Sequence, residues 1–237
     1  MTRLRYSSRA WSLFDLLFRP RMKMGVRGIR MAGLPAELPR DRPLLLVANH
    51  MSWWDGFLMR PLQRALRPED AFLTVMLEKE LRLRPFLRLL GGIGLDPGSL
   101  ASFRALLRFL EKERSESSRI SVLYFPQGRI WPTHRRPLGF KGGVRLVARA
   151  LAPVCALPVG LHLEAGNHPA PGAFLSVGSP RLIHDDELEP SEMEGAVEEE
   201  LDAILDFLAR HGEDVDEAWP TPGEPLPRSN RGVMQGR

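Results

Sequence analysis

His50 and Asp55 are the two side chains in this sequence whose types and spacing fit acid–base chemistry. An imidazole can take a proton from a hydroxyl near neutral pH, and a neighbouring carboxylate fixes its tautomer and stabilises the imidazolium that forms. Five residues along one regular helix would point the two side chains in different directions. The pair can meet across a turn that leads into the first turn of a helix.

The same residues also fit a purely structural interpretation. Ser52 and Asp55 have the spacing of a helix-capping pattern, with Ser52 as the N-cap, and an aspartate in the first helical turn favours the positive end of the helix. His50 would then be an ordinary histidine at the end of a strand. The spacing alone leaves both interpretations open.

The elements around this pair alternate between strands and helices. Residues 43–48 form a short apolar run, typical of a strand buried on both faces. Further strands are expected at 71–77, 120–125, 154–159 and 174–177, and helices at 53–66, 79–90, 99–114, 144–151 and 191–210. Residues 91–94 break the pattern with three glycines. This alternation predicts an α/β fold with a largely parallel or mixed central sheet flanked by helices, and places His50 at the carboxyl end of a strand, where ligands gather.

Four stretches, in order, resemble the glycerolipid acyltransferase superfamily, which includes bacterial lysophosphatidate acyltransferases. Residues 49–55 resemble its H-x-x-x-x-D signature, and residues 79–96 its second block, with Lys79-Glu80-Leu81, Pro85-Phe86 and Gly91-Gly92-Ile93-Gly94-Leu95-Asp96. Phe125-Pro126-Gln127-Gly128-Arg129 is similar to its third block, F-P-E-G-T-R. Pro137-Leu138-Gly139-Phe140-Lys141-Gly142-Gly143, followed by residues 152–159, resembles the block that completes the core. The resemblance covers roughly residues 40–165.

The resemblance implies an enzyme that moves a fatty acyl chain from a thioester to the hydroxyl of a lipid. His50 would remove the hydroxyl proton while Asp55 holds the imidazole, and backbone N–H groups near Gly128 would stabilise the oxyanion. The implied acceptor-binding residues are Phe125, Pro126, Gln127, Gly128, Arg129 and Lys141. The co-substrate would be acyl-CoA or acyl-carrier protein, the acceptor a lysophospholipid such as 1-acylglycerol-3-phosphate or another lipid or glycolipid alcohol, and neither a metal nor an organic cofactor is expected.

Three departures from the family pattern bear on the acceptor. Gln127 replaces the usual glutamate, Arg129-Ile130 replaces the Thr-Arg pair, and Pro97 follows Asp96 where the family has arginine. Phosphate is best held by an arginine fork, so these changes favour a less typical acceptor. Other cations that could compensate lie close by in the sequence. They are Arg135, Arg136 and Lys141, together with Arg129.

Residues 1–40 read as a basic amphipathic segment that associates with a membrane surface. Residues 1–30 carry eight Lys or Arg side chains against one acid, Asp15, although the net charge of the chain is only +4. The apolar residues between them are Trp11, Leu13, Phe14, Leu16, Leu17 and Phe18. Such a pattern favours an interfacial helix, although a helix packed on its own domain would share it. No run reaches the 18–20 apolar residues of a spanning helix.

We therefore expect an acyltransferase domain over 41–212 and a flexible Pro/Gly-rich tail over 213–237, acting peripherally or monotopically on the cytoplasmic face of a membrane. Cys155 is expected to be a buried core thiol. Asp185–Asp186 reads as a solvated helix start rather than a metal site.

Three rival functions remain to be weighed. A serine hydrolase lacks its G-x-S-x-G elbow, and the glycines at 91–94 satisfy neither a dinucleotide fingerprint nor a Walker sequence. A non-catalytic membrane module would explain the basic N-terminus without using His50. No nucleic-acid motif is visible, and no nucleic-acid partner is expected.

Overall fold

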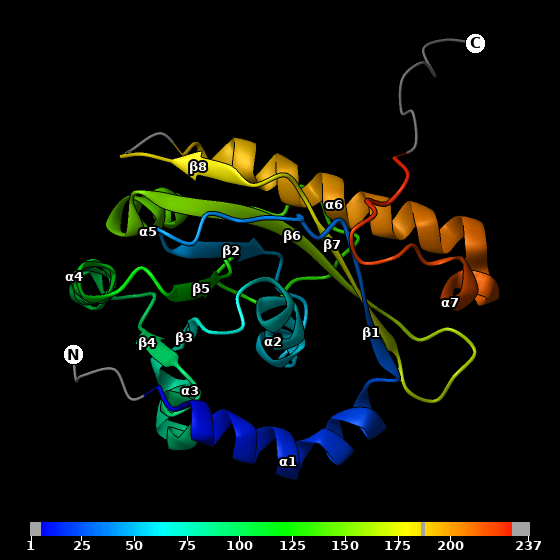
Figure 1. The fold of residues 1–237 in the computed structure, drawn as a ribbon, viewed down its shortest axis with the longest axis horizontal. Coiled ribbons are helices and arrows are strands. Elements are labelled where there is room, and N and C mark those ends of the chain that lie inside the picture. The colour runs from blue at the N-terminus through cyan, green and yellow to red at the C-terminus, as the bar shows by residue number, and fades with distance from the viewer. Residues whose placement is uncertain (1–5, 186–187, 229–237) are drawn as a thin grey trace.

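The computed structural model describes residues 6–185 and 188–228, which form one α/β structure (Figure 1). The helices are α1 (Ser8–Gly25), α2 (Asp55–Leu66), α3 (Glu78–Leu83), α4 (Leu100–Glu116), α5 (Gly143–Leu151), α6 (Pro190–His211) and α7 (Val215–Ala218), with 3-10 turns η1 (Pro85–Arg88) and η2 (Gly212–Asp214). The strands are β1 (Gly28–Ala32), β2 (Leu44–Ala48), β3 (Ala71–Leu77), β4 (Gly92–Leu95), β5 (Ile120–Tyr124), β6 (Val154–Glu164), β7 (Gly172–Val177) and β8 (Arg181–Ile183).

The strands form one eight-stranded sheet in the order β1-β7-β6-β2-β5-β3-β4, with β8 paired to β6. All neighbours in this order are parallel except β6 and β7, and the β6–β8 pair is also antiparallel. The expected fold class, a largely parallel or mixed sheet flanked by helices, is confirmed. β2 lies in the interior of the sheet between β5 and β6, which is why its sequence is apolar throughout.

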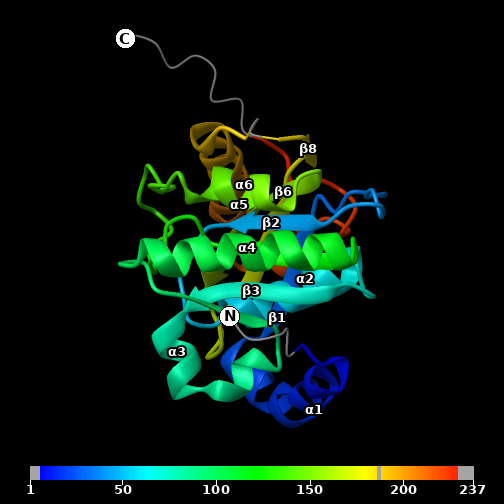
Figure 2. The same cartoon turned by 90° about the vertical axis from the view of Figure 1, so that its left-hand side faces the viewer.

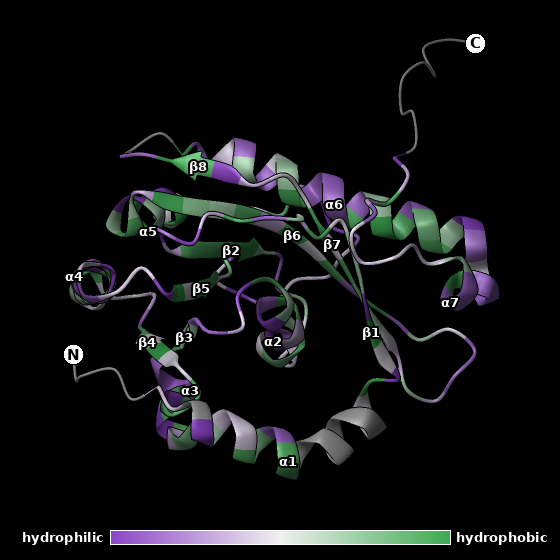
Figure 3. Ribbon diagram, in the orientation of Figure 1, coloured by the Kyte–Doolittle hydropathy of each residue, from purple (hydrophilic) through white to green (hydrophobic). Residues whose placement is uncertain are grey.

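The sheet separates two hydrophobic clusters. Leu45 and Val47 of β2 pack into the cluster beneath α4, α5 and α6, whereas Leu44 and Leu46 pack on the opposite side with α2 and α1. Figures 1 and 2 show α1 and α3 at one end of the molecule, and Phe14 of α1 stacks on Phe57 of the more central α2. In Figure 3 the central strands are almost wholly apolar, whereas α6 shows both polar and apolar residues. Cys155 is buried as expected, and burial raises the pKa of its thiol.

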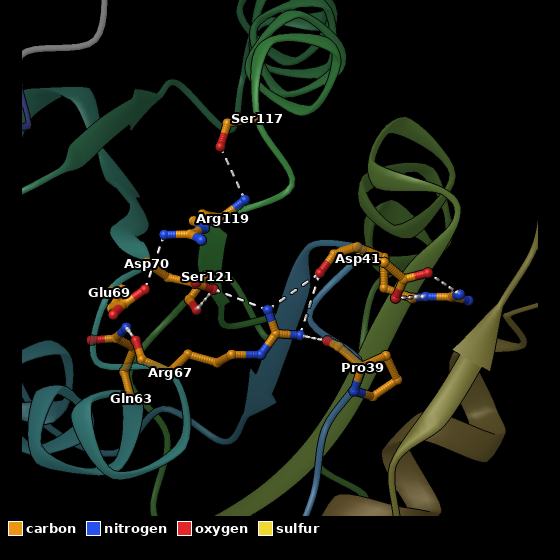
Figure 4. A network of polar contacts seen from close by, with 10 residues as sticks. Pro39, Asp41, Gln63, Arg67, Glu69, Asp70, Ser117, Arg119 and Ser121 are labelled. Carbon is orange, nitrogen blue, oxygen red and sulfur yellow. Dashed lines mark hydrogen bonds and ion pairs between the residues drawn. The ribbon is translucent and has the colours of Figure 1, made fainter.

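A buried polar network fixes the opposite end of the sheet from His50 (Figure 4). The Arg67 guanidinium donates to the carbonyls of Pro39 and Arg42 and lies 3.4 Å from the Asp70 carboxylate. Ser121 at the start of β5 donates to the same carboxylate at 2.8 Å. Burial nevertheless raises the pKa of Asp70. These contacts hold the chain that enters β2 against the chain that enters β3 and β5.

Three strands were not expected from the sequence: β1, β4 and β8. β4 is the most instructive, because its glycines looked like a turn. A Cβ on Gly92 would lie 2.7 Å from a Leu81 methyl, and a Cβ on Gly94 would lie 1.8 Å from the Glu78 carboxylate. The glycines therefore let α3 pack directly on a short parallel strand. The predicted helix over 79–90 divides into α3 and η1, which begins at Pro85.

The expected loose tail needs correction over residues 213–228. Val215 and Leu226 are buried with Phe207 of α6, and Trp219 packs against the same cluster. Gly33 and Leu34 donate backbone hydrogen bonds to Glu224 and Pro222. Apolar side chains spaced among prolines and glycines thus dock this segment on the domain. Residues 229–237 of the expected tail, and 1–5 of the expected N-terminal segment, lie outside the described residues.

Candidate active site

His50 and Asp55 meet where β2 ends and α2 begins. The Nδ1 of His50 lies 2.8 Å from Oδ2 of Asp55. The preceding residue, Asn49, is buried, and its side-chain amide makes two hydrogen bonds with the backbone of Leu161 in β6, at 2.9 and 2.8 Å. These two hydrogen bonds fix the end of β2. His50 is therefore positioned both by the strand that precedes it and by Asp55 at the start of α2.

The carboxylate of Asp55 is fully buried and accepts four hydrogen bonds. Besides His50 Nδ1, its donors are the N–H groups of Met51 and Ser52, at 2.7 and 3.0 Å, and the Ser52 hydroxyl. The helix begins at Asp55, its N-cap is Trp54, and no side chain caps it. The N-cap is therefore not Ser52, but part of the capping-box pattern is present, because Asp55 accepts the Ser52 N–H and the Ser52 hydroxyl accepts the Trp54 N–H at 3.2 Å. The same carboxylate also binds His50, so the two interpretations of Asp55 hold together.

The imidazole is oriented for proton transfer into an apolar pocket. A carboxylate only accepts hydrogen bonds, so the bond to Asp55 places the proton on Nδ1 and leaves a lone pair on Nε2. No described residue hydrogen-bonds Nε2. The ring stacks on Phe125, with centroids 4.4 Å apart, and the side chain is 23% exposed.

A pocket of about 440 Å³ begins at this imidazole. Its walls are mainly apolar and come from α2, β3, η1 and β5, among them Phe57, Met76, Leu87 and Tyr124, and from Leu90 and Phe125, which follow η1 and β5. Trp11 of α1 also lines the pocket, and its indole N–H donates to the Leu90 carbonyl at 3.1 Å. The sequence had suggested that Trp11 faces lipid, but Trp11 and Phe14 are buried against the domain. The N-terminal helix thus supplies part of the pocket wall.

Gln127 is the site residue whose position differs most from the expectation. It is 2% exposed and does not line the pocket. Its Oε1 accepts the N–H of His50 at 2.6 Å, and its Nε2 donates to the carbonyl of Leu138 at 3.2 Å. Gln127 therefore links the loop over residues 49–54 to the segment around residue 138. Pro126 beside it is also buried and away from the pocket.

The rest of the third block turns sharply at the pocket rim. Gly128 has a φ of +66°, a conformation that favours glycine, and its N–H donates to the Phe125 carbonyl at 3.1 Å. Arg129 is exposed and lines the pocket together with Gly128 and Phe125. Lys141 is exposed, and its Nζ lies only 3.2 Å from the position of a Cβ at Gly128. The structure thus places Phe125, Gly128 and Arg129 in the same pocket as His50, whereas Lys141 lies beside Gly128 and does not line that pocket.

Trp131 is a site residue that sequence reasoning missed. Its backbone N–H donates to the His50 carbonyl at 2.8 Å, which joins the chain after residue 129 to the loop over residues 49–54. Its only sequence signal is its place two residues after Arg129. Within 6–185 and 188–228, no three or more His, Cys, Asp or Glu side chains are grouped as a metal site would require. Asp186 lies outside these ranges.

Fold and site together define an α/β protein with an imidazole–carboxylate pair at the mouth of an apolar pocket. Residues 33–162 match the family model described as Acyltransferase, more than half of the chain, and the chain belongs to this family. The fold is similar to the crystal structure of the 1-acyl-sn-glycerophosphate (LPA) acyltransferase PlsC from Thermotoga maritima, with a TM-score of 0.52 and 21% identity, covering 83% of this chain and 76% of that chain. The resemblance to the glycerolipid acyltransferase superfamily is thereby confirmed. No curated protein matches the sequence.

Proposed function

We propose that this acyltransferase moves a fatty acyl chain from acyl-CoA or acyl-carrier protein to the hydroxyl of a lysophospholipid such as 1-acylglycerol-3-phosphate. The observation that carries this proposal is the His50–Asp55 pair, whose free Nε2 opens on an apolar pocket of about 440 Å³. Pockets of this size bury small ligands largely in apolar surroundings, as an acyl chain requires.

The chemistry follows from the geometry of the pair. Nε2 of His50 takes the proton of the acceptor hydroxyl as the oxygen attacks the thioester carbonyl, and the buried Asp55 carboxylate stabilises the imidazolium. The tetrahedral intermediate collapses, the C–S bond breaks, and the departing thiolate takes the proton from the imidazolium. Since the Gly128 N–H is already bonded to Phe125, the neighbouring Arg129 N–H, which has no partner in the described chain, is the proposed oxyanion donor.

Gln127 does not argue against a glycerol-phosphate acceptor in this arrangement. Its amide is used for the brace between His50 and Leu138 and does not reach the pocket. The replacement of the family's glutamate therefore changes how the loop over residues 49–54 is supported rather than what faces the acceptor.

We also propose that the protein works as a peripheral or monotopic protein at the cytoplasmic face of a membrane. Leu13, Leu16 and Leu17 on α1 are each more than half exposed. Leu83 at the end of α3, Phe86 in η1 and Leu89 just after η1 are exposed too. Phe14 and Phe86 pack 6.4 Å apart, so the two sets of exposed residues belong to neighbouring elements. Together with exposed arginines such as Arg9 and Arg82, they suit an interfacial surface. Among the described helices, none is long and apolar enough to cross a bilayer.

The membrane proposal is tested by Leu16→Ser/Leu17→Ser in co-sedimentation with vesicles that contain anionic lipid. The variant should bind vesicles several-fold more weakly yet keep its rate on short-chain soluble substrates, because neither side chain lines the pocket. Unchanged vesicle binding would assign the interaction to another surface.

The acyl-transfer proposal is tested by thiol release from a long-chain acyl-CoA by the full chain on lipid vesicles, with a panel of lipid alcohols. Release should depend on the acceptor and vanish in His50→Ala. His184→Ala, at an exposed histidine outside the pocket, is the matched control. Acceptor-independent release would indicate a thioesterase. No release with either donor class would favour a non-catalytic membrane module.

A further inference from the structure

Thr74 of β3 is a polar side chain on the apolar wall of the pocket. It is 6% exposed, and it lines the pocket. Its hydroxyl makes no hydrogen bond within the described chain. The described side-chain atoms that are fully enclosed and without a hydrogen-bond partner are all nitrogens, so the Thr74 oxygen is open to the pocket. A buried hydroxyl needs a partner, and this one must find it among the contents of the pocket.

Packing does not explain why this side chain is a threonine. Along β3, Leu73 and Val75 face the cluster beneath α4, whereas Phe72 and Met76 face the side of α1 and α2. Thr74 alternates with the first pair, so it lies on the apolar α1 and α2 side of the sheet. A valine would fill nearly the same volume without burying an unpaired hydroxyl, which destabilises a core.

Gly56 of α2 leaves room in front of Thr74. It also lines the pocket, and a Cβ there would meet only the Cγ2 of Thr74, at 3.8 Å. Its backbone does not require glycine, because its φ is not positive, and alanine would favour the helix. The missing side chain therefore leaves space beside the Thr74 hydroxyl for a substituent on a bound ligand.

Thr74 lies a short way below the catalytic imidazole. The ring of His50 stacks on Phe125, which follows Leu123 by two residues. Thr74 is the partner of Leu123 in the sheet, so it lies one pleat repeat, about 6.6 Å, deeper than Phe125. A thioester carbonyl attacked beside His50 would have its third carbon just above Thr74. A hydroxyl on that carbon, with a hydrogen bond of about 2.8 Å, reaches the Thr74 oxygen.

Tyr124 is a second buried hydroxyl side chain that lines the pocket, but its oxygen points elsewhere. Tyr124 packs in the cluster beneath α4 and α5, on the opposite side of the sheet from Thr74. A Cβ on Gly143, the first residue of α5, would lie 2.8 Å from its Oη. Tyr124 therefore offers a matched control, because it can lose a hydroxyl without changing the wall around Thr74.

We infer that the pocket binds a 3-hydroxyacyl chain, whose hydroxyl forms a hydrogen bond with the hydroxyl of Thr74. This inference rests on the proposed function and adds the class of acyl donor, a 3-hydroxyacyl thioester rather than an unsubstituted one. Either hydroxyl can donate to the other. Beyond the third carbon the chain continues along the apolar wall that Leu87, Leu90 and Trp11 form.

The test compares three pantetheine thioesters, whose arm is common to CoA and acyl-carrier protein: 3-hydroxydecanoyl, decanoyl, and a decanoyl chain hydroxylated at its methyl end. The wild type should have its highest kcat/KM with the 3-hydroxy chain. Thr74→Val should lower the preference for 3-hydroxydecanoyl over decanoyl by about tenfold, because valine keeps the shape of the wall and removes the hydroxyl. Thr74→Ser, which retains a hydroxyl, and Tyr124→Phe should both keep the preference.

Two further measurements do not depend on acyl transfer. In His50→Ala, calorimetry should show tighter binding of the 3-hydroxy thioester than of the decanoyl one, and adding Thr74→Val should remove the difference whether or not the wild type turns over. Thr74→Val should also unfold in urea no more easily than the wild type. A loss of stability would mean that the protein itself pairs the Thr74 hydroxyl and would overturn the inference.

The remaining outcomes also separate this inference from the proposed function. Equal use of the decanoyl and 3-hydroxydecanoyl donors by the wild type would overturn the inference and leave acyl transfer intact. The same would follow if Thr74→Val changed both donors by one factor. A preference for the chain hydroxylated at its methyl end would place the recognised oxygen away from Thr74 and overturn it as well.

Discussion

Replacing Asp55 by asparagine should separate the charge of this carboxylate from its structural role. Oδ2 accepts the hydrogen bonds of His50 Nδ1, Met51 N and Ser52 N, whereas Oδ1 accepts only the Ser52 hydroxyl. An asparagine whose carbonyl oxygen takes the Oδ2 position keeps three of these bonds. Its amide nitrogen then faces a hydroxyl, which can accept a hydrogen bond as well as donate one. The geometry and the tautomer of His50 survive, but the negative charge is lost.

The size of the effect follows from electrostatics. The attraction between an imidazolium and a carboxylate whose charge centres lie about 4 Å apart is about 4 kcal/mol at an effective dielectric constant of about 20. Because this attraction develops only as His50 takes the proton, Asp55→Asn should lower kcat by about 10³-fold. Asp55→Ala leaves the same donors without a hydrogen-bond acceptor, and each unpaired donor that is buried costs about 1–3 kcal/mol of stability. It should therefore also lose at least about 2 kcal/mol of unfolding free energy.

The assay pairs kcat, from thiol release at saturating donor and acceptor, with urea denaturation of each variant. Two results would refute the reasoning. If Asp55→Asn keeps more than a tenth of the wild-type kcat, the charge of the carboxylate is not used in the reaction. If it unfolds as easily as Asp55→Ala, the asparagine does not replace the hydrogen bonds as argued.

Three further changes have directions set by the structure. Gln127→Glu replaces the amide that donates to Leu138 by a carboxylate that cannot donate. The free energy of unfolding, measured in urea at pH 7, should therefore fall by about 1–3 kcal/mol. An unchanged value would mean that this hydrogen bond does not stabilise the fold. Trp11→Phe replaces a side chain that lines the pocket by a smaller one and so enlarges the pocket. In a series of acyl-CoA chain lengths, the preferred chain should therefore become longer. An unaltered preference would mean that the acyl chain does not bind against Trp11. Burial raises the pKa of Tyr124 to about 12, whereas an unfolded tyrosine titrates at about 10. The unfolded chain therefore loses this proton first, and stability should fall between those pH values by roughly 2–3 kcal/mol in the wild type. Tyr124→Phe should lack this fall, and an equal fall in both proteins would contradict the assignment.

The sequence could predict the elements whose signals are local. The five apolar residues of β2 read directly as a buried interior strand, and the turn between β2 and α2 was the one arrangement that brings His50 to Asp55. The amphipathic spacing of α4 and α6 likewise needed no knowledge of distant residues.

What escaped prediction depends on contacts between distant parts of the chain. Gly94 looks like a turn residue until α3 is known to pack on it. Gln127 looks like a ligand for the acceptor until Leu138 is known to lie at hydrogen-bonding distance. Trp219 lies in a segment of tail-like composition and is placed only by the cluster that α6 provides. No local pattern of residues encodes such neighbours.

The central claim is that His50 transfers an acyl chain from a thioester to a lipid hydroxyl. The most direct measurement follows a labelled acyl chain from acyl-CoA into the acceptor lipid by mass spectrometry, for the wild type, His50→Ala and His184→Ala. We predict acylated acceptor in equal amount to released CoA for the wild type and His184→Ala, and none above background for His50→Ala. Acylated acceptor formed equally well by His50→Ala would contradict the account.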